Sequence, residues 1–293
     1  MDYIFLLISV ICGATTSILA GFYDKKTSGI GGDNSAVYNL ILTATVMLCW
    51  CVSSLVEMSF TASVLPYSLG TGAFFACAMI GTTLAVKYGP VSLTSLFSQI
   101  SLIGVSVYGI ILWNAPLNVW AITGNAAVIL SIVLCFSGKE KEGNEKKINA
   151  KWLIFAAMSF VGNAGCSIIV KQQQLDFGGT NGSCAMFFAL SFALIITAVV
   201  FIFSDKSGCK AAIKRAGYFP VAAGAGNFGL NFFVVLLATS SLSSNVVYPV
   251  IAVGGLAISM LASVLIFKEK LNVFRWLGIA IGAAATAVLS IGA

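Results

Sequence analysis

The sequence contains no histidine and very little charge. Only 9% of its 293 residues are charged, whereas a soluble globular domain carries about 25%. A chain this poor in charge cannot build a water-facing surface. Without histidine, the chain also lacks the commonest metal ligand and the usual base beside a nucleophilic serine. We therefore expect no enzyme, no bound metal and no cofactor.

The acidic residues are missing from the interior of every apolar segment. Buried ionisable residues in membranes usually mark proton relays and ion sites. Their absence argues against a proton antiporter that uses a buried carboxylate, and against a deep site for a permanent cation. All ten acids lie at segment ends or in loops: Asp2, Asp24, Asp33, Glu57, Glu140, Glu142, Glu145, Asp176, Asp205 and Glu269.

The sequence is instead rich in long apolar segments, and 59% of its residues are hydrophobic. A membrane-spanning helix needs about 20 mostly apolar residues. The segments predict an all-α, multi-pass integral membrane protein with ten transmembrane helices, embedded in a lipid bilayer. The predicted spans are 3–22, 35–56, 64–86, 91–113, 117–137, 152–171, 183–204, 217–238, 243–267 and 273–292.

Basic residues alternate between the loops. Of the 16 Lys and Arg residues, only Lys171 lies outside the loops that follow the first, third, fifth, seventh and ninth spans. We call these five loops the odd loops. Short basic loops stay in the cytoplasm, so we expect both termini outside, most simply in a plasma (inner) membrane. The basic residues form no single patch, which argues against nucleic-acid binding.

The two halves of the chain resemble each other. The motif Leu-Asn-Val followed by an aromatic residue opens the fifth span at 117–120 and the tenth at 271–274. The two copies of the motif are 154 residues apart. Shifting the first half by this distance lays the fourth span onto the ninth and the third onto the eighth. Because each half has an odd number of spans, the second half must insert upside down, as in the inverted repeats of many transporters. We predict repeats at 1–137 and 151–293, joined by a cytoplasmic linker at 138–150.

Two stretches resemble known transporter families. Two five-span halves with a Lys-Glu-Lys-Leu-Asn turn at 268–272 resemble the drug/metabolite transporter superfamily, and within it the EamA-like members. The turn is similar to the family's G-E-x-L junction, with Lys268 in place of the Gly, whereas the first-half counterpart at 114–117 lacks the Glu. Residues 248–291 also resemble the last two helices of small multidrug resistance proteins.

The resemblance implies a ten-helix carrier of small metabolites, with a central cavity walled by spans one, three, four, six, eight and nine. Small multidrug exporters exchange protons at a Glu in their first helix, but this first span has no acid between Asp2 and Asp24. EamA-like proteins often place their basic loops on the opposite side. For orientation we follow the charges of this chain.

Neutral polar residues recur on single faces of several predicted spans. Asn227 and Asn231 are four residues apart in the eighth span, as are Asn163 and Ser167 in the sixth. An amide that faced lipid would leave its donors unpaired, so these groups must face protein or a water-filled cavity. The candidate substrate-binding residues are Thr16, Ser98, Gln99, Ser101, Asn163, Asn227, Asn231 and Tyr248.

Simpler structural roles compete with these assignments. A serine or threonine hydroxyl often bonds to its own helix or holds two helices together. For Lys87 and Lys171 the sequence predicts side chains that snorkel to the membrane surface. The GxGxxG match at 224–229 lies inside an apolar helical run, so we expect close helix packing there and no dinucleotide site. Gly278 and Gly282 form another packing face; we expect a monomer, with a homodimer left open.

These features favour a secondary-active or facilitative transporter of a small polar metabolite, neutral or zwitterionic, such as an amino acid, nucleoside or sugar. An exporter of lipophilic cations is the alternative, which aromatic residues near the cavity would support through cation–π contacts. A scaffold or sensor that transports nothing also fits the sequence, whereas a membrane-embedded enzyme fits poorly.

The orientation can be tested with a single engineered cysteine. On a cysteine-free background, Gly143→Cys places the only thiol in the predicted cytoplasmic linker. We expect a membrane-impermeant maleimide to label this variant in broken cells and inverted vesicles only. Labelling of intact cells from outside would contradict the assignment.

Overall fold

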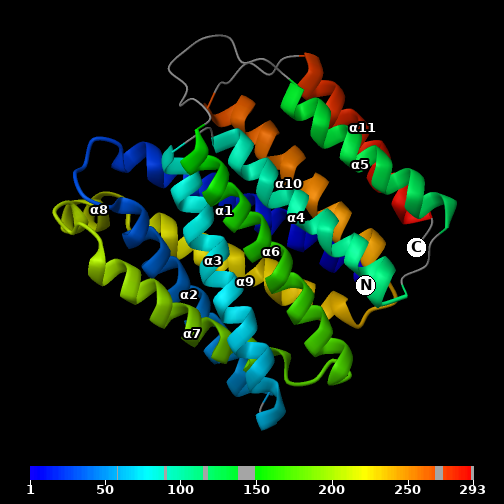
Figure 1. The fold of residues 1–293 in the computed structure, drawn as a ribbon, viewed down its shortest axis with the longest axis horizontal. Helices are drawn as coiled ribbons and strands as arrows, with labels where there is room; N and C mark the ends of the chain where they lie inside the picture. Colours follow the sequence, from blue (N-terminus) through cyan, green and yellow to red (C-terminus); the bar gives the residue numbers. More distant parts are fainter. Residues whose placement is uncertain (58, 89–90, 115–117, 138–148, 268–272, 292–293) are drawn as a thin grey trace.

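The computed structural model describes residues 1–57, 59–88, 91–114, 118–137, 149–267 and 273–291. All regular elements within these ranges are helices (Figure 1). They are α1 (Asp2–Thr27), α2 (Asn34–Glu57), the 3-10 turn η1 (Ala62–Val64), α3 (Leu65–Tyr88), α4 (Val91–Leu112), α5 (Val119–Ser137), α6 (Ala150–Asp176), α7 (Gly182–Phe203), α8 (Cys209–Ala216), α9 (Tyr218–Ala238), α10 (Ser244–Phe267) and α11 (Val273–Ile291).

The helices confirm an all-α, multi-pass membrane protein. Every predicted apolar segment coincides with a helix whose ends lie within a few residues of the prediction. Six helices, namely α1, α2, α3, α6, α7 and α9, are long and apolar enough to cross a bilayer. Within the described residues of the other four long helices, the apolar stretches are shorter: Ser101–Leu112, Ile122–Leu134, Val246–Ile258 and Trp276–Ala285.

The short helix α8 was not predicted. Its eight residues, CKAAIKRA, are too few and too polar for a span, so a search for long apolar runs passes over them. Ala212 and Ala216 are buried, whereas Lys210, Lys214 and Arg215 are exposed. The helix is therefore amphipathic and lies between α7 and α9 at one end of the bundle.

Consecutive long helices run in opposite directions, so the loops gather at two ends of the bundle (Figure 1). We call the end that carries the odd loops the odd end and the opposite end the even end. Lys87 of α3 forms an ion pair with Asp33 before α2 (N–O distance 3.6 Å), and the Asp33 amide donates to the Asp205 carbonyl after α7 at 2.8 Å. Three odd loops therefore meet at one end, as the alternating charges require.

Five helices close a ring through their contacts. α1 packs against α9 and α10, α10 packs against α4, α4 against α6, and α6 against α9. Outside this ring, α3 packs against α6, and α2 and α7 pack together. α5 and α11 lie side by side at the edge of the bundle (Figure 1).

Glycines allow the tightest helix crossings. A Cβ added at Gly81 of α3 would lie 2.6 Å from the backbone nitrogen of Ser159 on α6. On α9, the GxGxxG glycines face two neighbours, because a Cβ at Gly226 or Gly229 would press on Cys12 or Thr16 of α1, and one at Gly224 would press on α2. The motif is thus a packing face, as expected.

The α3–α6 crossing predicts a contrast between two glycines. Gly81→Ala forces helix backbones apart, so we expect it to lower the free energy of unfolding by about 1–3 kcal/mol, the usual cost of overpacking. Gly104→Ala on α4 is the matched control, because its nearest outside atom is Phe160 Cζ at 3.6 Å. An alanine there stabilises a helix by about 0.5–1 kcal/mol. Equal thermal melts of the two detergent-solubilised variants would contradict this reading of the crossing.

Candidate functional site

Ser159 of α6 is the hub of a polar group inside the membrane-spanning region. Its hydroxyl lies 2.6 Å from the Thr82 hydroxyl of α3 and 3.0 Å from the Ser98 hydroxyl of α4. The Asn163 amide, one turn along α6, donates to the Ser159 carbonyl at 2.9 Å. The structure therefore brings two predicted site residues, Ser98 and Asn163, together around a serine that the prediction did not include.

Asn227 and Asn231 form a second polar group, on α9. The Asn231 amide donates to the Asn227 carbonyl at 2.9 Å and to its side-chain oxygen at 3.0 Å. Asn227 is buried and Asn231 is half-buried. The two amides share one helix face, as their spacing predicts. The hydrogen bonds of the Asn231 amide stay within α9, whereas the Ser159 group joins α6 to α3 and α4.

Two other predicted residues bond mainly to backbone. The Ser101 hydroxyl donates to the Ser98 carbonyl of its own helix at 2.5 Å. The Thr16 hydroxyl donates to the Cys12 carbonyl at 3.1 Å and to the Ala223 carbonyl of α9 at 3.3 Å. These hydroxyls behave as the helix-packing alternative predicts.

The last two predicted residues are Tyr248, whose side chain the structure describes, and Gln99, of which it describes the backbone only. Tyr248 is buried near the start of α10, one residue before Pro249. The backbone of Gln99 is helical within α4, but its side chain lies outside the described part of the structure. The predicted linker at 138–148 and the turn at 268–272 also lie outside the described residues.

Lys171 on α6 is buried, so the prediction that it snorkels is wrong. Its side chain is 8% exposed, and its ammonium donates to the carbonyl of Ala238, the last residue of α9, at 3.0 Å. The same ammonium lies 5.6 Å from the centre of the Trp113 ring, just after α4. Position near a helix end favoured snorkelling, and nothing in the local sequence distinguishes the two outcomes.

Trp113 and its neighbours connect the ring helices at the even end. The Trp113 indole N–H donates to the side-chain oxygen of Gln172 on α6 at 2.8 Å. The Tyr108 ring packs edge-on against Trp113 with 5.2 Å between ring centres. The ends of α4, α6 and α9 are therefore held together by polar and aromatic contacts.

Two of the acids at this end, Glu57 and Asp176, have partners that fix helix ends. Glu57 accepts a hydrogen bond from the backbone N–H of Ser183 at the start of α7, at 2.7 Å, where the helix dipole favours a negative charge. Asp176 accepts from the Tyr67 hydroxyl at 2.5 Å and from the Gln172 amide at 2.8 Å. Neither acid forms an ion pair within the described part of the chain.

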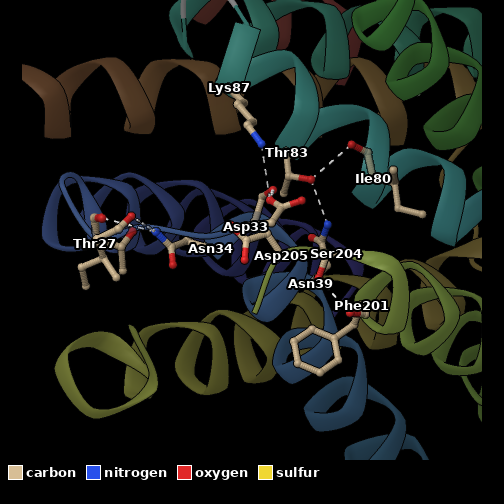
Figure 2. Close-up of polar contacts among 12 residues, drawn as sticks. Thr27, Asp33, Asn34, Asn39, Ile80, Thr83, Lys87, Phe201, Ser204 and Asp205 are labelled. Atoms are coloured by element: carbon tan, nitrogen blue, oxygen red, sulfur yellow. Dashed lines mark hydrogen bonds and ion pairs between the residues drawn. The ribbon is translucent and has the colours of Figure 1, made fainter. Parts of the chain in front are cut away.

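The odd end carries its own polar network, which Figure 2 shows. The Asn39 amide of α2 donates to the Thr83 hydroxyl of α3 at 2.8 Å, one turn from the Lys87–Asp33 ion pair. These contacts tie α2 to α3 next to the loop that contains Asp205. Lys87 is about half exposed, as expected for a lysine at the membrane surface.

The larger of two described cavities is unsuited to a polar solute. It holds about 310 Å³ between α1, α10 and α11, and its walls are Tyr3, Leu6, Leu7, Val10, Val250, Gly254 and Ala287. A second cavity of about 20 Å³ lies beside Asn39 and Thr83 at the odd end. None of the eight predicted site residues lines either cavity. Among the described residues, no group of three or more Cys, Asp or Glu side chains is placed to hold a metal ion.

Comparison with solved structures shows that this fold occurs elsewhere. One solved structure, described only as "Crystal structure of protein", superposes with a TM-score of 0.68 over 97% of both chains, at 13% sequence identity. At this identity the likeness concerns the fold alone. No protein-family model and no curated protein sequence matches the chain.

The hub role of Ser159 predicts a measurable loss of stability. Ser159→Ala removes the hydroxyl that lies between Thr82 and Ser98, so we expect a loss of about 1–3 kcal/mol from the groups left unpaired. Ser191→Ala on α7 is the control, because that hydroxyl donates to the Phe187 carbonyl of its own helix. If thermal melts showed the same small effect for both, Ser159 would not be a hub.

Proposed function

We propose that the chain is a secondary-active or facilitative carrier of a small polar metabolite, neutral or zwitterionic, of the amino acid, nucleoside or sugar class. Ten helices cross the membrane as two inverted five-helix repeats, 1–137 and 151–293, which move against each other to expose a central site to each side in turn. Both termini lie outside a plasma membrane, and the carrier works as a monomer.

The pairing of helices supports the inverted repeat. Matching the halves in order equates α1 with α6, α2 with α7, α3 with α9, α4 with α10 and α5 with α11. Under this exchange, the α1–α9 contact becomes α6–α3, α1–α10 becomes α6–α4, and α2–α9 becomes α7–α3. The α2–α7, α4–α10 and α5–α11 contacts map onto themselves. All six relations occur among the main contacts of the bundle, and this observation carries the proposal.

The polar side chains of the ring helices support a polar solute without strong positive charge. Ser98, Asn163 and Asn231 offer hydroxyl and amide groups, which recognise a solute through hydrogen bonds. The acids Glu57 and Asp176 lie at the even end and have structural partners. Carboxylate chemistry is therefore unavailable to a solute at the centre.

The alternative, export of lipophilic cations, has less support. A buried ammonium at Lys171 faces the ends of α4 and α9, and it would repel a cation that passed between them. A scaffold that transports nothing does not need polar side chains on several ring helices. Only a direct assay separates it from a carrier.

Counterflow in proteoliposomes tests the proposal. Vesicles loaded with unlabelled amino acids, nucleosides or hexoses, one class at a time, are diluted into the labelled compound. We expect transient accumulation for one class, and none in vesicles without protein. Folded, correctly inserted protein that accumulates no class would overturn the carrier proposal.

Asn231 separates a role in solute binding from a role in packing. Asn231→Leu keeps the bulk and removes the amide. If the amide binds solute, affinity falls by about 1–3 kcal/mol, the cost of an unmatched polar group, and the melting temperature changes little. Ser191→Ala again serves as the control in both measurements. A well-folded variant with unchanged affinity would remove this part of α9 from the site.

A further inference from the structure

Lys171 is a buried cation that contacts a backbone carbonyl and an aromatic ring, both of them uncharged. Its ammonium has three donors, and the structure gives it one hydrogen bond, to the Ala238 carbonyl at 3.0 Å, and the face of the Trp113 ring. Charged groups within membranes pair with one another or with backbone carbonyls and mark solute or ion pathways. Lys171 therefore either caps the backbone carbonyl of Ala238 or marks a solute pathway.

The acids at this end of the bundle are engaged elsewhere, and Asp2 among them accepts a hydrogen bond from the Ser241 hydroxyl at 3.0 Å. Asp176, five residues further along α6, accepts hydrogen bonds from Tyr67 and Gln172. Glu57 accepts from the start of α7 and from Ser59. Among the described residues, the one ion pair is Lys87 with Asp33 at the opposite end of the bundle. An anion at the Lys171 ammonium would therefore displace no carboxylate.

Two polar stripes lead to Lys171. On α6, Ser159, Asn163, Ser167 and Lys171 recur at every fourth residue, so they follow one side of the helix. On α4, Ser98, Ser101 and Tyr108 lead towards Trp113, whose ring the ammonium faces. Ser98 and Asn163 already meet around Ser159 in the middle of the bundle. Lys171 thus lies at the even end of the same helix stripe as the proposed site residue Asn163.

The ammonium also connects α4 and α9, the two helices on either side of α6 in the ring. It bonds to the last residue of α9 and faces the residue that follows α4. A solute that moved from the Ser159 group towards the even end would pass between these helix ends. Such a solute would meet the Lys171 ammonium there.

We propose that the Lys171 ammonium binds the carboxylate of the transported solute, so that the carrier takes zwitterionic amino acids in preference to sugars or nucleosides. This inference rests on the proposed transport function and narrows its substrate class. A carboxylate attracts the ammonium through its full negative charge, which a neutral backbone carbonyl lacks. A carboxylate therefore displaces Ala238 from Lys171 and loosens the contact between α6 and α9.

A purely structural role makes different predictions. As a cap on the carbonyl end of α9, Lys171 would stabilise the helix terminus through its positive charge. Its loss would then lower the melting temperature, and the relative affinities of different solutes would stay the same. A solute-binding role predicts instead a change in the preference for carboxylate over amide, which a cap cannot alter.

The experiment is competition counterflow in proteoliposomes. Four pools are tested on the wild-type protein: amino acids, amino acid amides, hexoses with nucleosides, and sugar phosphates. The transported compound is then measured, beside its amide, on Lys171→Gln and Lys171→Arg. Lys87→Gln is the matched control, because it removes a lysine at the odd end. Size-exclusion profiles and melts without solute monitor the fold of each variant.

We expect the wild-type protein to bind an amino acid at least about tenfold more tightly than its amide, a ratio that Lys171→Gln abolishes and that Lys171→Arg and Lys87→Gln keep. If Lys171→Gln does not fold, the ratio of acid to amide affinity in the wild-type protein still tests whether the solute carboxylate is recognised. Equal affinity for acid and amide, or transport of hexoses or nucleosides only, would overturn the inference and leave the carrier standing. Preference for sugar phosphates would assign the ammonium to phosphate and also overturn it. No transport of any pool by folded protein would overturn both proposals.

Discussion

The interior of a bilayer offers no water to a polar group, and this constraint governs the whole structure. Backbone amides and carbonyls must pair within each segment, so the chain forms helices throughout its apolar stretches. The same requirement applies to side chains: the Asn231 amide bonds to Asn227, the Asn163 amide bonds to Ser159, and Lys171 bonds to Ala238. These side chains meet another polar side chain or a backbone carbonyl inside the bundle.

Close helix packing provides the second condition. With lipid as apolar as the side chains, helices associate through van der Waals contact and hydrogen bonds, which small residues permit by bringing backbones together. Gly81 and Gly162 allow α3 and α6 to cross closely, and Gly226 and Gly229 do the same for α9 and α1. These are equivalent crossings when the two halves are matched. The closeness of α3 to α6 is also what brings Thr82 to Ser159.

The sequence predicts the helices well because long apolar runs and polar loops are local signals. It also predicts which residues share a face, as for Asn227 and Asn231, because helical spacing is local too. Partners across the bundle are a different matter. Ser98 and Ser159 are 61 residues apart, and Lys171 and Ala238 are 67 apart. No local pattern shows that Lys171 turns inward. An amphipathic helix of eight residues, such as α8, is too short to stand out in the sequence.

The ring is asymmetric in a way that suits a carrier caught in one state. α6 packs against α9 at the even end, but the equivalent helices α1 and α3 make at most a marginal contact in the described part of the chain. On the alternating-access account, movement of the halves exchanges these two arrangements and exposes the site to the other side. On this account, the contact between Lys171 of α6 and Ala238 of α9 exists in one of the carrier's two states and breaks in the other.

Accessibility of the centre from each side tests that account most directly. A single cysteine in place of Asn163, on a cysteine-free background, is treated with a membrane-impermeant thiol reagent in right-side-out and in inverted vesicles. Alternating access predicts reaction from both sides, with a fixed solute gradient shifting the two rates in opposite directions. A cysteine that reacts from neither side, or from one side only under all gradients, in folded protein would contradict it.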